Sequence, residues 1–284
     1  MQFEDVVTDL GMRQADIAQQ DKVFVVRTLD EIDEAHDLDK VGLVFGLEAA
    51  TPIGNEVDKL DVLYGLGIRQ IGIAYSDSNA LGSGLNERVD GGLTMLGRRS
   101  VDRMNGLGMA IDISHSGDLT GIETCRASTK PVLMTHAGAR ALWDIPRLKS
   151  DDALKAVADT GGLIGISAAP HTTCSTAHPR HTIESVIDHF HYCVDLVGID
   201  HVAFGPDTLY GDHVGLHTTF GHLLRMGDWT APEHEKVPYV DGLENPTECF
   251  HNLAACLVRD GHSDEDIAKV LGGNIQRALA EIWH

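Results

Sequence analysis

Short apolar runs alternate with longer stretches of mixed polar and apolar residues along most of this chain. Six runs are short and apolar enough to be buried strands, and they lie at Val41–Glu48, Gln70–Tyr75, Met109–His115, Val132–His136, Leu163–Ser167 and His201–Phe204. The stretches between them predict helices at Glu56–Leu66, Gly97–Leu107, Leu119–Ala127, Ser150–Thr160 and Ile183–Val197. Such alternation predicts a parallel sheet covered by helices.

The strand-helix unit recurs every roughly 25–35 residues, which is typical of a TIM-type (β/α)8 barrel. A closed barrel needs two more strands than the six above. The first 40 residues offer one short extended run, Val23–Arg27, between the helical stretches Phe3–Gln20 and Leu29–Asp37. After Phe204, a long loop (Asp207–Pro246) leads to two further helices, Pro246–Arg259 and Ser263–Trp283. We therefore predict one α/β domain over residues 1–284, an incomplete (β/α)8 barrel.

Composition narrows the classes of partner. The chain has 22 basic and 43 acidic residues, a net charge of −21, so nucleic acid is excluded as a partner because its phosphates would be repelled. No apolar run has the roughly 20 residues that span a bilayer, and the N-terminal residues lack signal-peptide character. The five cysteines form no close pairs, as expected of free thiols. We predict a cytoplasmic protein without membrane partners.

Three polar residues end predicted strands: Glu48, His115 and His136. In a parallel βα fold the carboxyl ends of the strands meet on one face, where active sites collect. Two histidines and an acid form a ligand set of hydrolytic zinc sites. Taken alone, these residues also allow other roles. Glu48 could be an acid at a helix N-terminus, and either histidine could be a hydrogen-bonded core residue.

Seven segments, taken in order, resemble one family. They are Gly46–Gly54, Leu66–Asn79, Gly92–Arg98, Met104–His115, Thr135–Leu142, Val197–Asp207 and Leu271–Arg277. Each is a weak motif alone, but their order and spacing closely resemble the membrane dipeptidase (renal dipeptidase) family of zinc metallopeptidases. The resemblance runs from about residue 20 to the C-terminus. It implies a βα barrel of the amidohydrolase type with two zinc ions.

The resemblance also assigns roles to individual residues. Glu48 corresponds to the carboxylate that bridges both metals, and His115 and His136 to the two histidines of one metal site. Arg147 corresponds to the arginine facing the substrate carboxylate, for which a planar guanidinium is suited. Asp207, in Phe-Gly-Pro-Asp, corresponds to the acid that handles the proton in catalysis.

Some of these assignments have alternatives. Asp207 follows Gly-Pro and could form a turn, and Arg147 could pair with the acids of the following helix start. Tyr75 stands where some family members place a histidine near the substrate, so we expect it to contact substrate.

One departure from the family changes the expected metal content. The family's first strand carries a His-x-Asp motif for the other metal, and no His-x-Asp precedes Glu48 here. The nearest approximation, His36-Asp37, is adjacent instead of alternate and lies in a charged helical stretch. We therefore expect at most one tightly bound Zn²⁺.

The sequence favours a zinc-dependent dipeptidase that hydrolyses dipeptides through a metal-activated water. Two alternatives stay open: a catalytically silent homologue acting as a binding protein, and a related amidohydrolase acting on a lactone or cyclic amide. The partner is then a dipeptide or similar small molecule. An open barrel exposes strand edges, and we expect them to be covered either by the helical stretch Phe3–Gln20 or by a second copy of the chain in a homo-oligomer.

Overall fold

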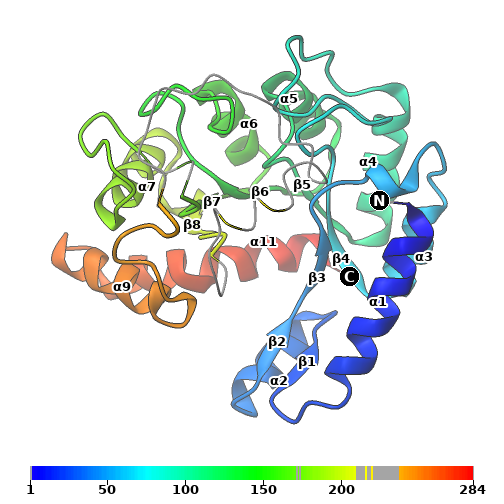
Figure 1. Ribbon diagram of the computed structural model, residues 1–284, viewed down its shortest axis with the longest axis horizontal. Coiled ribbons are helices and arrows are strands. Elements are labelled where there is room, and N and C mark those ends of the chain that lie inside the picture. The colour runs from blue at the N-terminus through cyan, green and yellow to red at the C-terminus, as the bar shows by residue number, and fades with distance from the viewer. Residues whose placement is uncertain are drawn as a thin grey trace. The chain divides into compact units, whose positions relative to one another are not determined.

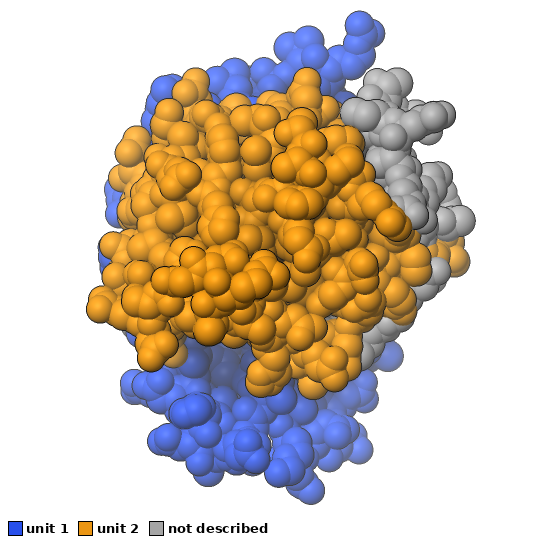
Figure 2. All heavy atoms as spheres, turned by 90° about the vertical axis from the view of Figure 1, so that its left-hand side faces the viewer, with its two compact units in different colours: residues 1–132, 278–284 blue, residues 133–277 orange. Residues whose placement is uncertain are grey.

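The structure is a computed structural model that describes residues 2–170, 172, 174–208, 215, 219 and 237–283. Most of the predicted Asp207–Pro246 loop therefore lies outside the described residues. The chain divides into two compact units, one of residues 1–132 with 278–284 and one of residues 133–277 (Figure 2). A single domain over 1–284 stays a prediction.

The first unit begins with a small parallel pair of strands. Helix α1 (Phe3–Ile17) leads to β1 (Val23–Val25), and α2 (Leu29–Asp37) leads to β2 (Val41–Leu43), which pairs with β1 (Figure 1). Thr28 caps α2 by accepting a hydrogen bond from the Glu31 amide, as a Ser/Thr-x-x-Glu capping box predicts. The run around residues 23–27 is therefore a strand between two helices, as predicted.

The same unit continues with three parallel strands in the order β3, β4, β5. They are Phe45–Leu47, Ile68–Gly72 and Ala110–Asp112. The 3-10 turn η1 (Thr51–Ile53) follows β3, and the helices are α3 (Lys59–Gly65), α4 (Met95–Leu107) and α5 (Asp118–Ala127). Helix α4 starts at the Thr94 cap and stops at Gly108, whose φ of 72° suits glycine.

The predicted strand Val41–Glu48 is wrong in one respect, because it is two strands and not one. β2 pairs with β1, β3 pairs with β4, and the chain changes partner at Val44. Periodicity cannot reveal this break, since both halves are equally apolar. Apolar side chains of this segment stay exposed, Val44 by 43% and Val41 by 55%.

The second unit holds three further parallel strands in the order β6, β7, β8. They are Val132–Ala137, which begins at the last residue of the first unit, Leu163–Ile166 and Val202–Phe204. Its helices in the described part of the chain are α6 (Asp151–Asp159), α7 (Ile183–Val197), α9 (Pro246–Arg259) and α10 (Asp264–Ala268), with the 3-10 turn η2 (Ile199–His201) before β8. The last helix, α11 (Asn274–Ile282), begins in this unit, and its residues from 278 onward are counted with the first unit. The βα repeat of both units confirms the predicted fold class, an incomplete parallel βα barrel.

The predicted C-terminal helix Ser263–Trp283 is also wrong as a single element. A π-helical segment, Lys269–Gly273, separates α10 from α11 and departs from helical angles at Gly272. The buried Asn274 fixes this kink, because its Nδ2 donates to the carbonyls of Ile199 and Val202 at 2.8 and 2.9 Å. Tertiary hydrogen bonds, together with two adjacent glycines, override the helical pattern.

Two compositional expectations can be compared with the structure. The five cysteines take part in no disulfide, as predicted, and the structure adds that all five are buried. Among the described residues, no helix combines the length and apolar character needed to cross a bilayer.

Candidate functional site

Glu48 follows β3 directly, where the chain leaves the sheet. A side chain at the neighbouring Gly72 would place its Cβ 1.9 Å from the Glu48 carbonyl oxygen, so glycine is required for β4 to approach this closely. The Glu48 carboxylate itself is 56% exposed. An exposed carboxylate anchored by a rigid strand end is suited to bind a cation.

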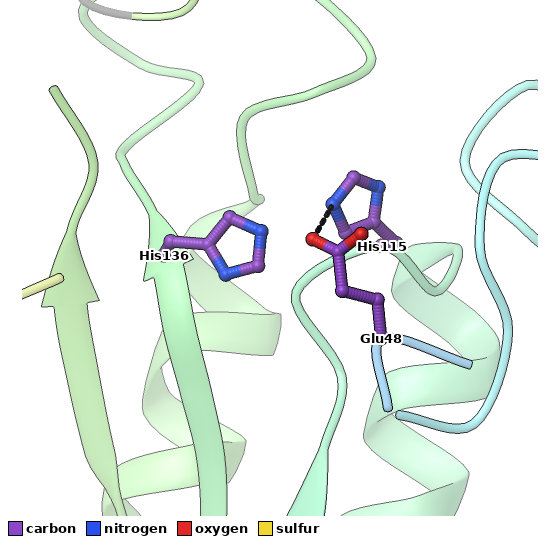
Figure 3. A group of neighbouring side chains, drawn as sticks. All are labelled: Glu48, His115 and His136. Carbon is purple, nitrogen blue, oxygen red and sulfur yellow. Dashed lines mark ion pairs between the residues drawn. The ribbon is translucent and has the colours of Figure 1, made fainter. Parts of the chain in front are cut away.

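His115 lies three residues after β5, in a turn that Asp112 fixes. The buried Asp112 carboxylate accepts hydrogen bonds from the amide and hydroxyl of Ser114, at 3.0 and 2.6 Å. The His115 side chain is only 9% exposed, and its Nε2 lies 3.7 Å from Glu48 Oε1 (Figure 3). Both groups are metal-ligand types, and this separation lets them share one ion.

Tyr75 stacks on the His115 ring. The two ring centroids are 4.1 Å apart and the planes differ by 19°. Tyr75 follows β4 in the way His115 follows β5, so the parallel strands bring the two side chains together. The phenol limits the rotation of the imidazole and thereby fixes its direction.

His136 lies near the end of β6 in the second unit (Figure 3). Its Nδ1 is 2.7 Å from the Thr135 hydroxyl oxygen. A hydrogen bond at one ring nitrogen is the usual arrangement when the other nitrogen binds a metal. Packing here is close, since a Cβ on Gly165 or Gly205 would lie 2.1 or 1.7 Å from the Thr135 carbonyl oxygen.

Arg147 is buried, and Nη2 of its guanidinium donates to the His136 carbonyl at 2.8 Å. The connection after β6 folds back on itself to bring it there, with the Lys149 amide bonded to the Gly138 carbonyl at 2.9 Å. The arginine is therefore tied to a candidate ligand, which favours a role at the site over a surface ion pair.

Asp207 lies three residues after Phe204, the last residue of β8, and has a φ of 55°. Non-glycine residues rarely adopt this conformation, and such positions cluster at functional sites. Asp207 lines a small pocket with Ala168, Pro170 and Tyr239. Its left-handed backbone and its place beside this pocket are compatible with a catalytic role for its carboxylate.

Sequence reasoning missed His189, which lies on the buried face of α7. Its Nδ1 accepts from the Ala139 amide at 3.1 Å, and its Nε2 donates to the Cys174 carbonyl at 2.9 Å. The ring is therefore neutral and links the connections that follow β6 and β7. Burial lowers the pKa of His189. The available signal was its place among Val186, Phe190 and Cys193 on an apolar helix face.

The structure places the nearest approximation to the absent His-x-Asp motif away from any strand. His36 and Asp37 both lie in α2, exposed to solvent, as the charged pattern predicts.

Comparisons with known proteins identify relatives across the whole chain. The sequence profile of the membrane dipeptidase family (peptidase family M19) matches residues 9–220. The chain is 27% identical to the dipeptidase tcpJ of Claviceps purpurea over 99% of its own length and 62% of the relative's. It is 30% identical to an uncharacterized protein from the pqqA 5' region of Klebsiella pneumoniae, over 69% of this chain and 78% of that protein. The chain thus spans about three fifths of the length of the fungal dipeptidase.

Solved structures agree on the fold. An amidohydrolase from Pseudomonas aeruginosa superposes with a TM-score of 0.90 at 28% identity, covering all of this chain and 86% of the other. A metallopeptidase from Rhodobacter sphaeroides, solved with a phosphinate mimic of the dipeptide L-Ala-D-Ala, superposes with a TM-score of 0.78. The superposition on the Rhodobacter sphaeroides enzyme covers 100% of this chain and 77% of that one, at 22% identity. At this identity, it supports a shared fold and nothing more.

Proposed function

The chain belongs to the membrane dipeptidase family, and from this premise we propose that it is a zinc-dependent dipeptidase. The reaction is hydrolysis of the peptide bond of a dipeptide by a metal-activated water. The observation that carries the proposal is the set Glu48, His115 and His136, each of which offers one ligand atom within 4.8 Å of the others (Figure 3).

The chemistry of this donor set fits zinc. Two imidazoles and a carboxylate are typical ligands of a catalytic zinc site with one open position. Within the described part of the chain, this is the one group of three or more potential ligand residues so arranged. Bound zinc would supply Lewis acidity and lower the pKa of a coordinated water towards about 7. We propose one tight zinc per chain, because His36 and Asp37 lie in α2 and supply no second ligand pair.

The remaining assigned residues handle the substrate. Asp207 takes the proton from the attacking water and returns it to the leaving amine, as a general base and acid. Arg147 binds the substrate's terminal carboxylate through its planar guanidinium. Tyr75 holds the His115 ring and contacts the substrate beside it. Each of these roles is supported by the residue's place at the end of a strand or in the connection that follows one.

Turnover of dipeptides by the zinc-loaded full chain tests this proposal. We expect release of free amino acids from unblocked dipeptides and none from C-amidated analogues, because Arg147 needs a terminal carboxylate. Calorimetry measures whether the same dipeptides bind, and together with turnover it distinguishes the dipeptidase from the two alternative functions. Binding without turnover would contradict the dipeptidase and indicate the silent homologue, and turnover of lactones alone would indicate the other amidohydrolase.

We also propose that the partner is a small dipeptide-like molecule, that the protein acts in the cytoplasm, and that it forms a homo-oligomer. The exposed apolar residues of the β2–β3 segment support self-association, because unpaired strand edges with apolar side chains favour pairing with another chain.

A further inference from the structure

A buried imidazole in the second unit joins the two connections that carry substrate-handling residues. His189 lies on α7, which packs against β7 and β8 (Figure 1), and its side chain is fully buried. Its Nδ1 accepts a hydrogen bond from the Ala139 amide at 3.1 Å, and its Nε2 donates to the Cys174 carbonyl at 2.9 Å. Ala139 is in the connection after β6 and Cys174 in the connection after β7. The proposed reaction gives this histidine no part.

The bond from Ala139 supports the segment that carries Arg147. This connection folds back on itself, because the Lys149 amide bonds to the Gly138 carbonyl at 2.9 Å, and the fold brings Arg147 to the end of β6. A side chain at Gly138 would place its Cβ 2.9 Å from His189 Nδ1, so glycine lets the imidazole approach the backbone this closely. The hydrogen bond between Ala139 and His189 therefore fixes the base of the fold that presents the guanidinium.

The bond to Cys174 supports the segment beside Asp207. Between β7 and Cys174 the chain makes a tight turn, in which the Thr172 hydroxyl donates to the Ala169 carbonyl at 2.9 Å. At the start of this turn the Ala168 amide donates to the carbonyl of the residue before Asp207, also at 2.9 Å. Ala168 and Asp207 line the same small pocket. A displacement of Cys174 is therefore transmitted through the turn to Asp207.

The protonation state of His189 is suited to hold both connections. A neutral imidazole accepts a hydrogen bond at one nitrogen and donates at the other, whereas a protonated ring donates at both and would lose the bond from Ala139. Burial lowers the pKa of His189, so the ring stays neutral and keeps both bonds at pH 7.

We propose that His189 is a positioning residue for dipeptide hydrolysis, which holds Arg147 and Asp207 at the separation that a two-residue substrate requires. The inference rests on the proposed function, because it takes Arg147 to bind the terminal carboxylate and Asp207 to transfer the proton. The buried imidazole acts through the backbone of the two connections and does not touch the substrate. Its two hydrogen bonds lead to different residues, so one controls substrate binding and the other controls the rate.

Two substitutions in the zinc-loaded full chain remove these bonds one at a time. His189→Asn places an oxygen near the position of Nδ1 and keeps the bond from Ala139, whereas His189→Gln places an amide nitrogen near the position of Nε2 and keeps the bond to Cys174. His189→Gln should raise KM for dipeptides about tenfold and change kcat less than about twofold, because a loss of uniform binding raises KM alone. His189→Asn should lower kcat by roughly 10–100-fold with less effect on KM, because a displacement of about 1 Å can cost about a hundredfold in rate.

A purely structural role for His189 would lower stability without dividing KM from kcat in this way. The matched controls are His191→Asn and His191→Gln, at a histidine of α7 whose side chain is 42% exposed, and Val186→Ala, at a buried position of the same helix. Val186→Ala should lower the free energy of unfolding and, like the His191 variants, leave KM and kcat within about twofold of the unchanged chain. Positioning by His189 is ruled out if its two variants change KM and kcat in the same proportion, or if they match the His191 controls.

Calorimetry on the metal-free chain distinguishes failure of this inference from failure of the proposed function. His189→Gln should weaken binding of a free dipeptide about tenfold, and His189→Asn should leave it within about twofold. If the unchanged chain binds dipeptides but never hydrolyses them when loaded with zinc, the dipeptidase is wrong, and this pattern of binding still supports the positioning of Arg147. If hydrolysis occurs and both His189 variants bind and turn over dipeptides as their controls do, the positioning role alone is wrong. A chain that neither binds nor hydrolyses dipeptides would overturn both.

Discussion

The phenol ring of Tyr75 lies face to face with the imidazole of His115, with centroids 4.1 Å apart. His115 Nε2 in turn lies 3.7 Å from Glu48 Oε1. Three consecutive strand ends, β3, β4 and β5, therefore supply a carboxylate, a supporting ring and an imidazole to one place. Tyr75, whose strand lies between the strands of the two candidate ligands, packs against one of them, His115.

Replacing Tyr75 separates ring support from hydroxyl chemistry. Tyr75→Phe keeps the stack, so zinc affinity should stay within about twofold of the unchanged chain. Tyr75→Ala removes it, and zinc affinity should fall about tenfold, the lower end of the effect of losing a supporting partner. Competition with a chromogenic chelator measures both. Equal zinc affinity in the two variants would show that the stack does not position His115.

Asp207 is assigned to proton transfer and not to metal binding. Asp207→Asn should therefore reduce dipeptide turnover about 10²–10⁴-fold and leave zinc content unchanged. His115→Ala should instead lose zinc and activity together. Parallel measurement of kcat and of metal by atomic absorption distinguishes the two. Loss of zinc in Asp207→Asn would make the aspartate a ligand, and unchanged kcat would remove it from the mechanism.

His189 predicts an acid-sensitive stability. Burial lowers its pKa in the folded chain, so the unfolded chain takes up a proton that the folded chain does not. Its contribution to stability is complete above the unfolded value of about 6.5 and is lost as the pH falls below it, at up to about 1.4 kcal/mol per pH unit.

Urea unfolding at pH 7 and pH 5 measures this effect. His189→Gln should lower stability at pH 7 by about 1–3 kcal/mol, because buried hydrogen bonds to Ala139 and Cys174 are disturbed. It should also reduce the difference between the free energies of unfolding at pH 7 and at pH 5, whereas His251→Gln should leave that difference unchanged. If the difference in unfolding free energy between the two pH values is the same in both variants, His189 is not the source of the acid sensitivity.

The exposed edge at β2–β3 predicts self-association. Val44→Lys would place a charge in any contact made there, and should raise the dissociation constant of a dimer at least about tenfold, the equivalent of about 1.4 kcal/mol. Met12→Lys, at an exposed position of α1, is the control and should have no such effect. Sedimentation equilibrium gives the constants. A monomer at all concentrations in the unchanged chain would contradict the homo-oligomer.

Helices were the most predictable part of the fold because their signals are local. Helix α7 spans Ile183–Val197 as predicted, since Thr182 and Gly198 bound an apolar periodic segment. Features set by distant partners were not predictable. The change of strand partner at Val44 depends on β1 and β4, and the kink before Asn274 depends on carbonyls about 70 positions earlier in the chain.

The candidate site also has features that could be predicted from the sequence and features that could not. Glu48, His115 and His136 could be selected from sequence because each is a ligand type at the end of an apolar run. The stacking of Tyr75 on His115 and the bridging position of His189 could not be predicted from the sequence. A stacking contact and a fixed tautomer arise only when separate strands and helices pack together.

Zinc titration of dipeptide hydrolysis tests the central claim most directly. The chain should first be stripped of metal by a chelator. Hydrolysis should return with added zinc and level off at one equivalent per chain, and the same chain with Glu48→Gln should recover little activity. The account is contradicted if no zinc concentration restores hydrolysis, if two equivalents are required, or if Glu48→Gln recovers as fully as its parent.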